Sequence, residues 1–368
     1  NLRDSDLCAR LGGDEFILVL PESGTRASLT SKAEQLLSVI SEPYQLNGHL
    51  LSLSSSVGIS QFPQDGDNFT MLVRHADAAL HQAKQNGRNG FCFYEPSMLE
   101  TLNDRSTLDH DLRDAVSLSQ LAMMYQPQFR FGDNQPRRVE ALMRWLHPQL
   151  GNVSPVEFIP IAETTGQIHS MGQWALEQAC KQFLAWREQG LLLEKIAINV
   201  SAIQINAGFA SRLMASLADM AFDPAWLELE ITETAMMSGI TEVTRQISLL
   251  RNQGVEFSID DFGTGYSSLS KLKSMPVTVL KIDQSFVRDI NDDISDYEIA
   301  RAIILMAKSL GLTVVAEGVE SRAQAAILQR LGCDWGQGFL FSPPLTGDDF
   351  LNRYADSALR RPSVVGIE

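Results

Sequence analysis

Residues 256–265 read Glu-Phe-Ser-Ile-Asp-Asp-Phe-Gly-Thr-Gly, a short apolar strand that ends in two adjacent carboxylates and a glycine-containing loop. Apolar strands with a polar residue at or near the end recur on both sides of this stretch. Near-continuous apolar runs of this length are typical of parallel strands covered on both faces. Eight such strands are expected after residue 120, at 122–131, 138–145, 195–200, 226–232, 256–261, 279–283, 313–316 and 336–341.

Helix-length segments separate most of these strands. Eight strand–helix units over about 250 residues have the size and rhythm of a (β/α)8 barrel. Residues 132–136 join the first two strands, and this connection is too short for a helical crossover, so the pair should be antiparallel. The sequence therefore predicts an α/β fold, an irregular (β/α)8 TIM-like barrel whose first strand pair is antiparallel.

The N-terminal part follows a different, mixed pattern that predicts an α+β domain. The chain starts without an initiator Met and enters a strand-like segment at once, so we expect it to begin inside that domain. We expect a partial domain over 1–96, a stiff helical connector over 97–120 and the barrel over 105–365. Within the first domain we expect strands at 16–20, 51–59 and 91–94, and helices at 31–40 and 71–86.

The charge balance limits the classes of partner. The chain has 30 Lys and Arg against 45 Asp and Glu, a formal net charge of −15, which argues against a general nucleic-acid binder and against an anionic membrane surface. No stretch is long and apolar enough to span a bilayer. The four scattered cysteines have no metal-binding spacing and indicate reduced thiols in a cytoplasmic protein. A membrane anchor in the intact protein would lie ahead of Asn1.

Polar side chains gather at the ends of the predicted barrel strands, which is where the catalytic residues of such barrels lie. Converging carboxylates repel one another unless divalent cations neutralise them. Because the donors are oxygens, without His or Cys, the set suits Mg²⁺ or Mn²⁺. The residues concerned are Glu140, Asn199, Glu230, Glu233, Asp260, Asp261, Lys281, Asp283, Glu317, Glu320 and Gln337.

The adjacent Asp260 and Asp261 sharpen this prediction. Two metal ions that share a carboxylate can clamp a phosphodiester and generate a hydroxide for in-line attack. Lys281 lies inside an apolar strand and could stabilise a phosphate or polarise the attacking water. The alternative for Lys281 is a lysine at the edge of the core that pairs with Asp283.

These residues resemble the EAL phosphodiesterases, which hydrolyse cyclic di-GMP to the linear dinucleotide pGpG. The similarity covers roughly residues 105–351. Phe339 stands where a Tyr is common in that family, and Ile203 where an Arg is common. The motifs that carry the resemblance are Tyr125-Gln126-Pro127, Glu140-Ala141-Leu142, Phe158-Ile159-Pro160, Asn199-Val200-Ser201-Ala202, Glu230-Ile231-Thr232-Glu233, residues 260–269, Lys281-Ile282-Asp283, Glu317-Gly318-Val319-Glu320 and Gln337-Gly338-Phe339.

The resemblance implies roles for individual residues. It gives one metal to Glu140, Asn199, Glu230 and Asp260, and a second to Asp260 and Asp261, with Glu317 close to the metal-bound waters. It implies that Lys281 and Glu317 activate water and that Glu233 holds the loop at 261–266. It assigns the substrate to Gln126, Arg144, Gln337, Glu320 and Asp283. It also implies a homodimer formed through the barrel domain.

The first domain resembles the GGDEF diguanylate cyclases, whose signature is Gly12-Gly13-Asp14-Glu15-Phe16 here. The resemblance implies phosphate contacts of GTP at Lys84 and Arg88, and an inhibitory site at Arg3 and Asp6. The alternative for Arg3 and Asp6 is an ordinary solvated turn. The front half of the cyclase fold is missing, so we do not expect this chain to form cyclic di-GMP.

The leading hypothesis is therefore a metal-dependent cyclic di-GMP phosphodiesterase with a regulatory nucleotide-binding remnant ahead of it. Two alternatives stay open. The barrel could be a catalytically silent receptor for cyclic di-GMP, or the intact protein could be a bifunctional cyclase and phosphodiesterase. Binding without hydrolysis would favour the receptor, and turnover of GTP by the intact protein would favour the bifunctional enzyme.

Overall fold

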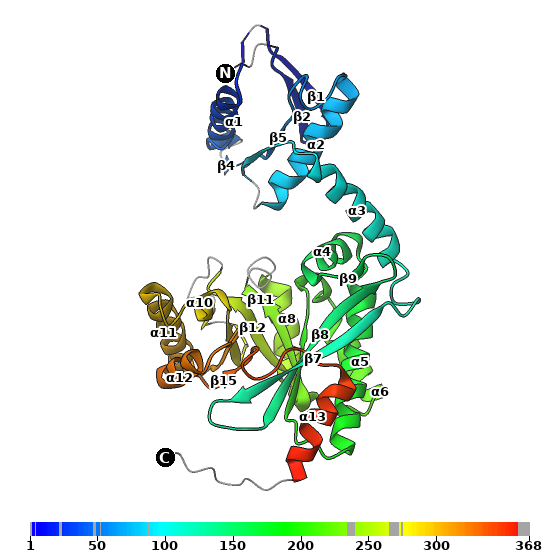
Figure 1. The fold of residues 1–368 in the computed structure, drawn as a ribbon, viewed down its shortest axis with the longest axis vertical. Coiled ribbons are helices and arrows are strands. Elements are labelled where there is room, and N and C mark those ends of the chain that lie inside the picture. Colours follow the sequence, from blue (N-terminus) through cyan, green and yellow to red (C-terminus); the bar gives the residue numbers. More distant parts are fainter. Residues whose placement is uncertain are drawn as a thin grey trace. The chain divides into compact units, whose positions relative to one another are not determined.

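The structure is a computed structural model of the chain. It describes residues 2–3, 5–21, 24–46, 49–51, 53–86, 89–233, 240–264, 272–273 and 275–359. The chain divides into two compact units, Asn1–Leu108 and Asp109–Glu368 (Figure 1). None of the helices in the described ranges combines the length and the apolar character that crossing a membrane requires.

The first unit combines short two-stranded sheets with helices. Strands β5 and β6 pair in parallel, and α2 packs on β5 so closely that a Cβ at Gly58 would lie 2.0 Å from the carbonyl oxygen of Ala76. Only glycine fits this contact. The elements are β1 (Leu7–Gly12), β2 (Glu15–Val19), α1 (Arg26–Ile40), β3 (Tyr44–Leu46), β4 (His49–Leu51), β5 (Val57–Ile59), α2 (Phe69–Gln85), β6 (Phe91–Phe93) and α3 (Ser97–Leu112), the last of which crosses the boundary between the units.

Two sequence predictions in this region are wrong. The single strand expected at 51–59 is two strands in different sheets, because β4 pairs with β3 whereas β5 pairs with β6. The connector expected to be helical over 97–120 ends its helix at Leu112, and turns follow up to Ser119, which has a positive φ of 55°. The amide of Gln120 bonds to the carbonyl of Ala115, which closes these turns before the next strand.

The second unit is a closed eight-stranded barrel with one additional short strand, β9. Strand β7 is antiparallel to both of its neighbours, β8 and β15, and the remaining barrel strands are parallel. The predicted irregular (β/α)8 barrel with an antiparallel first pair is confirmed. The strands are β7 (Leu121–Arg130), β8 (Pro136–His147), β9 (Gly151–Val153), β10 (Lys195–Asn199), β11 (Leu227–Thr232), β12 (Glu256–Phe262), β13 (Val279–Ile282), β14 (Thr313–Ala316) and β15 (Trp335–Gly336).

Helices surround the barrel (Figure 1), and apolar side chains of helices and strands form one buried cluster. The fully buried Phe183 and Trp186 of α5 are part of this core, together with Phe257 of β12. The helices are α4 (Pro155–Thr165), α5 (Ile168–Glu188), η1 (Ala202–Gln204), α6 (Phe209–Asp219), η2 (Pro224–Trp226), α8 (Ile240–Arg251), α10 (Ser285–Arg288), α11 (Ile294–Ser309), α12 (Arg322–Leu331) and α13 (Gly347–Leu359).

The eighth barrel strand is shorter than the predicted 336–341. Strand β15 comprises only Trp335 and Gly336, and Gln337 follows it rather than lying on it. The backbone then passes against Val319, where a Cβ at Gly338 would lie 2.3 Å from both the amide nitrogen and the carbonyl oxygen. This close crossing replaces the regular strand ladder.

Strand register determines which side chains share the C-terminal end of the barrel. Glu230 of β11 lies opposite Asn199 of β10. On the other side of β11, Thr232 lies opposite Asp260 of β12. Glu140 on β8 lies opposite Ala197 of β10. The polar side chains at these positions therefore converge inside one end of the barrel.

Candidate functional site

Lys281 is the centre of the polar cluster inside the barrel. It is 1% exposed, and its Nζ lies near carboxylate oxygens from four different segments of the chain. The distances are 2.6 Å to Glu317 Oε1, 2.8 Å to Glu230 Oε2, 3.1 Å to Asp260 Oδ1 and 3.5 Å to Glu140 Oε2. Asp283 accepts instead from the backbone amide of Ser285 at 3.0 Å, so the alternative pairing of Lys281 with Asp283 is wrong.

A local irregularity in β12 explains how adjacent aspartates reach the same place. In a regular strand, successive side chains point to opposite faces. The register between β12 and β13 is regular at Ile259 and is broken before Phe262. Asp261 has a positive φ of 54° within this break. The break is consistent with a bulge, which can re-aim a side chain next to a functional site.

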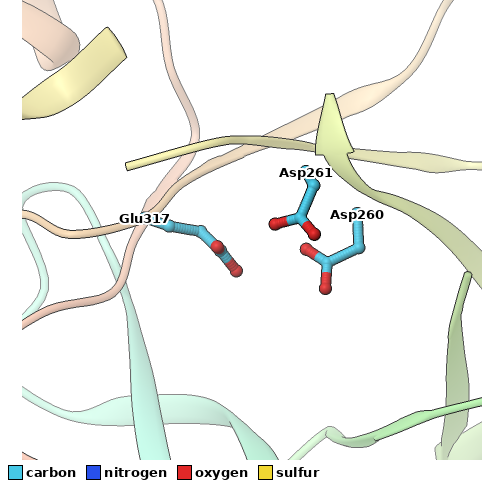
Figure 2. Close-up of side chains that lie close together, drawn as sticks. All are labelled: Asp260, Asp261 and Glu317. Atoms are coloured by element: carbon cyan, nitrogen blue, oxygen red, sulfur yellow. The ribbon is translucent and has the colours of Figure 1, made fainter. Parts of the chain in front are cut away.

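Asp260, Asp261 and Glu317 form a compact group of oxygen ligands. Each offers one oxygen, and these oxygens lie within 4.8 Å of one another. Figure 2 shows the two aspartates side by side at the end of β12, with Glu317 approaching from the neighbouring segment. Oxygens this close can contact one cation, since metal–oxygen distances are about 2.0–2.6 Å.

Burial and mutual repulsion raise the pKa of several of these acids. Burial, with the charges of Asp260 and Asp283, raises the pKa of Asp261 to about 6. Burial also raises the pKa of Glu317 to about 8, against the opposing effect of Lys281. The pKa of Glu230 is well above its ordinary value because of burial and the neighbouring Glu140. One ammonium does not balance this concentration of carboxylates.

The partners of Lys281 and Glu140 outweigh the effect of their burial. Burial alone would lower the pKa of Lys281, but Asp260, Glu140 and Glu230 raise it well above its ordinary value. Burial alone would raise the pKa of Glu140, but Lys281 and the amide of Gln337 hold it below that value. The charged forms of both groups are therefore favoured.

Two carboxamides donate to the carboxylate of Glu140, and a third, Gln126, is bonded to one of them. Asn199 Nδ2 donates to Glu140 Oε1 at 2.8 Å, and Gln337 Nε2 donates to Glu140 Oε2 at 2.6 Å. Gln337 Nε2 also donates to Gln126 Oε1 at 2.9 Å. Asn199, Gln126 and Gln337 are thus brought together at Glu140.

The other predicted residues of the barrel lie on β8, directly after β11 and after β14. Glu233 Oε2 accepts the backbone amide of Gly263 at 2.9 Å, which connects β11 to the start of the loop after β12. Arg144 is half-buried on β8 and donates to the carbonyl of Met143. Glu320 is exposed after β14. Residues 265–269 of the loop motif fall outside the described residues.

The residues fit a divalent cation. The ligands are carboxylate and carboxamide oxygens, the set that Mg²⁺ and Mn²⁺ prefer. Glu230 Oε1 is buried and has no hydrogen-bond partner among the described residues. An orphaned carboxylate oxygen of this kind is costly unless a cation or donor compensates it.

In the first unit, the predicted GGDEF-like residues occupy a hairpin turn. Gly12 ends β1 and Glu15 begins β2, with Asp14 in the turn between them. Asp6 Oδ2 accepts the amide of Arg3 at 2.7 Å, which makes a local turn of the two proposed inhibitory residues. Of the two residues expected to contact the phosphates of GTP, Lys84 on α2 is exposed, and Arg88 lies outside the described residues.

Sequence reasoning missed Gln128. This side chain is 1% exposed inside the barrel, and its Nε2 donates to Gln337 Oε1 at 2.9 Å. The signal was its place two residues after Gln126 on β7, because alternate residues of a strand share a face. Two buried glutamines on the same face of β7 therefore belong to the polar interior of the barrel.

Family models match both units. Residues 109–344 match the model described as EAL domain, and residues 1–90 match the model described as Diguanylate cyclase, GGDEF domain.

Curated relatives match almost the whole chain. The Bifunctional diguanylate cyclase/cyclic di-GMP phosphodiesterase MucR of Pseudomonas aeruginosa is 42% identical over 352 residues, which is 95% of this chain and 51% of that protein. The Cyclic di-GMP phosphodiesterase PdeR of Escherichia coli is 36% identical over 354 residues, 96% of this chain and 53% of that protein. The chain thus spans about half the length of these curated relatives.

Solved structures match two thirds of the chain or more. A structure described as PaMucR Phosphodiesterase, c-di-GMP complex, superposes with a TM-score of 0.64 at 41% identity, over 67% of this chain and 100% of that one. The EAL enzyme Bd1971, in a form bound to cAMP and cyclic-di-GMP, gives a TM-score of 0.66 at 30% identity, over 78% of this chain and 76% of that one. The chain belongs to the EAL-domain family and carries a GGDEF-domain segment ahead of its EAL domain.

Proposed function

We propose that the EAL domain hydrolyses cyclic di-GMP to linear pGpG with the help of divalent cations. The observation that carries this proposal is the convergence of Glu140, Glu230, Asp260 and Glu317 on the buried Lys281 at the strand ends of the barrel. The complete oxygen-ligand set favours an enzyme over a silent receptor. The names of the relatives, one of them a phosphodiesterase in complex with c-di-GMP, support the same substrate.

We assign two Mg²⁺ or Mn²⁺ ions to this site. Glu140, Asn199, Glu230 and Asp260 would hold one ion, and Asp260 with Asp261 would hold the other, with Glu317 near its waters. Such ions, when bound, supply charge for the phosphodiester and a water of lowered pKa. The acidic site would hold these cations, and the bound cations would let an acidic protein accept an anionic dinucleotide.

The protein's own groups would position the substrate and the attacking water. Lys281 Nζ lies 2.6 Å from Glu317 Oε1, so the two groups together can hold or transfer a proton at the nucleophile. Gln126, Arg144, Gln337, Asp283 and Glu320 would contact the dinucleotide. Glu233 would keep the loop after β12 in place through its bond to Gly263.

The direct test is hydrolysis by the purified chain. With cyclic di-GMP and Mn²⁺ or Mg²⁺, we expect pGpG to accumulate, and EDTA should stop it. Glu140→Gln should lower turnover by more than about 100-fold, because a metal contributes several kcal/mol of transition-state stabilisation. Glu177→Gln on the exposed surface of α5 is the matched control and should keep full activity. Folded protein that binds cyclic di-GMP without forming pGpG would establish the receptor instead.

For the first unit we propose a regulatory role in which Asp14, Glu15 and Lys84 bind GTP. We also propose that the EAL domain forms a homodimer. The motif in an exposed turn supports accessibility to a nucleotide. Adding GTP to the hydrolysis assay should change the rate, and Asp14→Asn should abolish that change. A mass measurement in solution tests the dimer. We place the protein in the cytoplasm, where cyclic di-GMP would be met.

A further inference from the structure

The inside of the barrel contains a directional chain of side-chain amides that ends on Glu140. Gln128 Nε2 donates to Gln337 Oε1 at 2.9 Å, and Gln337 Nε2 donates to Glu140 Oε2 at 2.6 Å and Gln126 Oε1 at 2.9 Å. Gln126 Nε2 then donates to the backbone carbonyl of Ser342 at 3.1 Å. We call these three glutamines, together with their acceptors Glu140 and the Ser342 carbonyl, the amide relay.

The two ends of the relay determine how the amide of Gln337 is oriented. A carboxylate and a backbone carbonyl can only accept, so Gln337 must present its NH2 to Glu140, and Gln126 must present its NH2 to Ser342. Rotating the amide of Gln337 by half a turn would place its oxygen against the oxygens of Glu140 and Gln126. In the observed orientation, Gln337 Oε1 points away from Glu140 and needs a donor. Gln128 Nε2 is that donor.

The surroundings make this donor important. Gln128 is 1% exposed and Gln337 is 5% exposed. A buried acceptor that loses its donor carries the full cost of desolvation. Without the NH2 of Gln128, Gln337 Oε1 would lose this donor, and the orientation that presents the NH2 of Gln337 to Glu140 would become less favourable.

We propose that Gln128 is a positioning residue for the metal centre, which acts through Gln337 to fix the carboxylate of Glu140. This inference rests on the metal-binding role proposed above for Glu140. Outer-shell partners of metal ligands typically affect affinity by about 10- to 100-fold. We expect the loss of Gln128 to weaken Mn²⁺ binding within that range.

The test is Mn²⁺ titration of the metal-free full chain, followed by calorimetry or by the electron paramagnetic resonance of free Mn²⁺. Gln128→Met keeps the length of the side chain and removes the donor, and it should weaken Mn²⁺ binding by about tenfold or more. Gln246→Met is the matched control, because Gln246 is also 1% exposed but bonds to Ala210 and Glu242 on the outside of the barrel. It should bind Mn²⁺ like the wild type.

A double-mutant cycle separates positioning from a general structural effect. If Gln128 acts through Gln337, Gln128→Met in the Gln337→Met background should cost no further Mn²⁺ affinity. This arm also remains measurable if Gln128→Met alone fails to fold, because the double variant removes Gln337 Oε1 together with its donor.

The outcomes of this experiment are distinct. Folded Gln128→Met with wild-type Mn²⁺ affinity, or a double variant whose two losses add, overturns the relay. A wild-type chain that binds no Mn²⁺ and forms no pGpG overturns the proposed function itself. A wild type that binds and hydrolyses, with weakened binding in Gln128→Met alone and no additional loss in the double variant, supports both.

Discussion

Lys281 is a fully buried cation whose ammonium group contacts four carboxylates. Its charge compensates part of their mutual repulsion, so in the metal-free protein it has a structural role as well as the catalytic one proposed above. The two roles can be separated because structural compensation can also come from a bound ion, whereas the proton-handling role requires the amine itself.

Lys281→Met should therefore destabilise the metal-free protein strongly. Removing one partner of a buried ion pair costs about 3–5 kcal/mol because the remaining charges are uncompensated. Mn²⁺ should restore more stability to this variant than to the wild type, while hydrolysis stays lost. Urea unfolding with and without Mn²⁺ measures both effects.

The control for Lys281→Met is Lys181→Met, which removes an exposed ion pair with Glu177 at 3.6 Å on α5. Exposed pairs contribute about 0–1 kcal/mol. Equal losses in the two variants would refute the central role of Lys281.

Gly338 is a second residue whose substitution should have a defined effect. Its φ is 152°, and a Cβ there would lie 2.3 Å from two backbone atoms of Val319, which cannot move away as a side chain would. Gly338→Ala should cost about 1–3 kcal/mol of unfolding free energy and should reduce activity, because it displaces the neighbouring Gln337.

The control for Gly338→Ala is Gly190→Ala, which measures the cost of a positive φ without a steric clash. Gly190 also has a positive φ, 88°, but a Cβ there would meet nothing within 4 Å. Its variant should lose stability without losing activity. Unimpaired hydrolysis in Gly338→Ala would show that Gln337 does not depend on this close crossing.

At the scale of elements, the end of β8 is tied to the last turn of α3. His147 is buried, and its Nδ1 accepts the backbone amides of Gln149 at 3.2 Å and Leu150 at 3.1 Å. The ring proton must then lie on Nε2, which is 3.0 Å from Asp111 Oδ2. One imidazole therefore holds the β8–β9 turn and α3 together.

His147→Phe should keep the edge-on packing against Trp145 and lose every one of these hydrogen bonds. We expect a loss of about 1–3 kcal/mol from the unpaired amides. Asp111→Asn retains an acceptor for Nε2 and should lose much less. Urea titration of the two variants decides this, and a larger loss in Asp111→Asn would contradict the assigned roles of the ring nitrogens.

The barrel could be predicted because its strands are short, apolar and separated by helix-length segments. The antiparallel first pair followed from the short connection at 132–136. The convergence of carboxylates followed from the common edge at which parallel strands end. These features depend on patterns that are local in the sequence.

The parts that escaped prediction depend on contacts between distant segments. After the short strand β15, the chain passes close to the backbone of Val319. Gln128 bonds to Gln337, which is more than 200 residues away in the chain. The break in β12 at Asp261 is a departure from strand geometry that the sequence Asp-Asp does not predict. Alternation along β7 places Gln128 on the same face as Gln126, but it does not indicate which distant side chain Gln128 bonds to.

At the scale of the whole molecule, the two units have very different cores. The barrel unit buries a large continuous cluster that includes several aromatic side chains. Among the described residues, the buried apolar side chains of the first unit are mostly alanines. Because apolar burial is the main stabilising term, the first unit should unfold at the lower temperature. The buried apolar residues of the first unit are Leu29, Ala33, Ala78, Ala79, Ala83, Phe93 and Leu108.

Calorimetry of the full chain should therefore show two transitions, of which Mn²⁺ raises only the upper one. The proposed ligands all belong to the barrel unit, and a ligand that binds the folded state at 100 times its Kd adds about 2.7 kcal/mol. For a unit of this size, that corresponds to a rise of about 5–10 °C in Tm. Glu140→Gln should abolish the rise, and EDTA should reverse it. A rise confined to the lower transition would move the metal site to the first unit, because an ion stabilises the unit whose folded state holds its ligands.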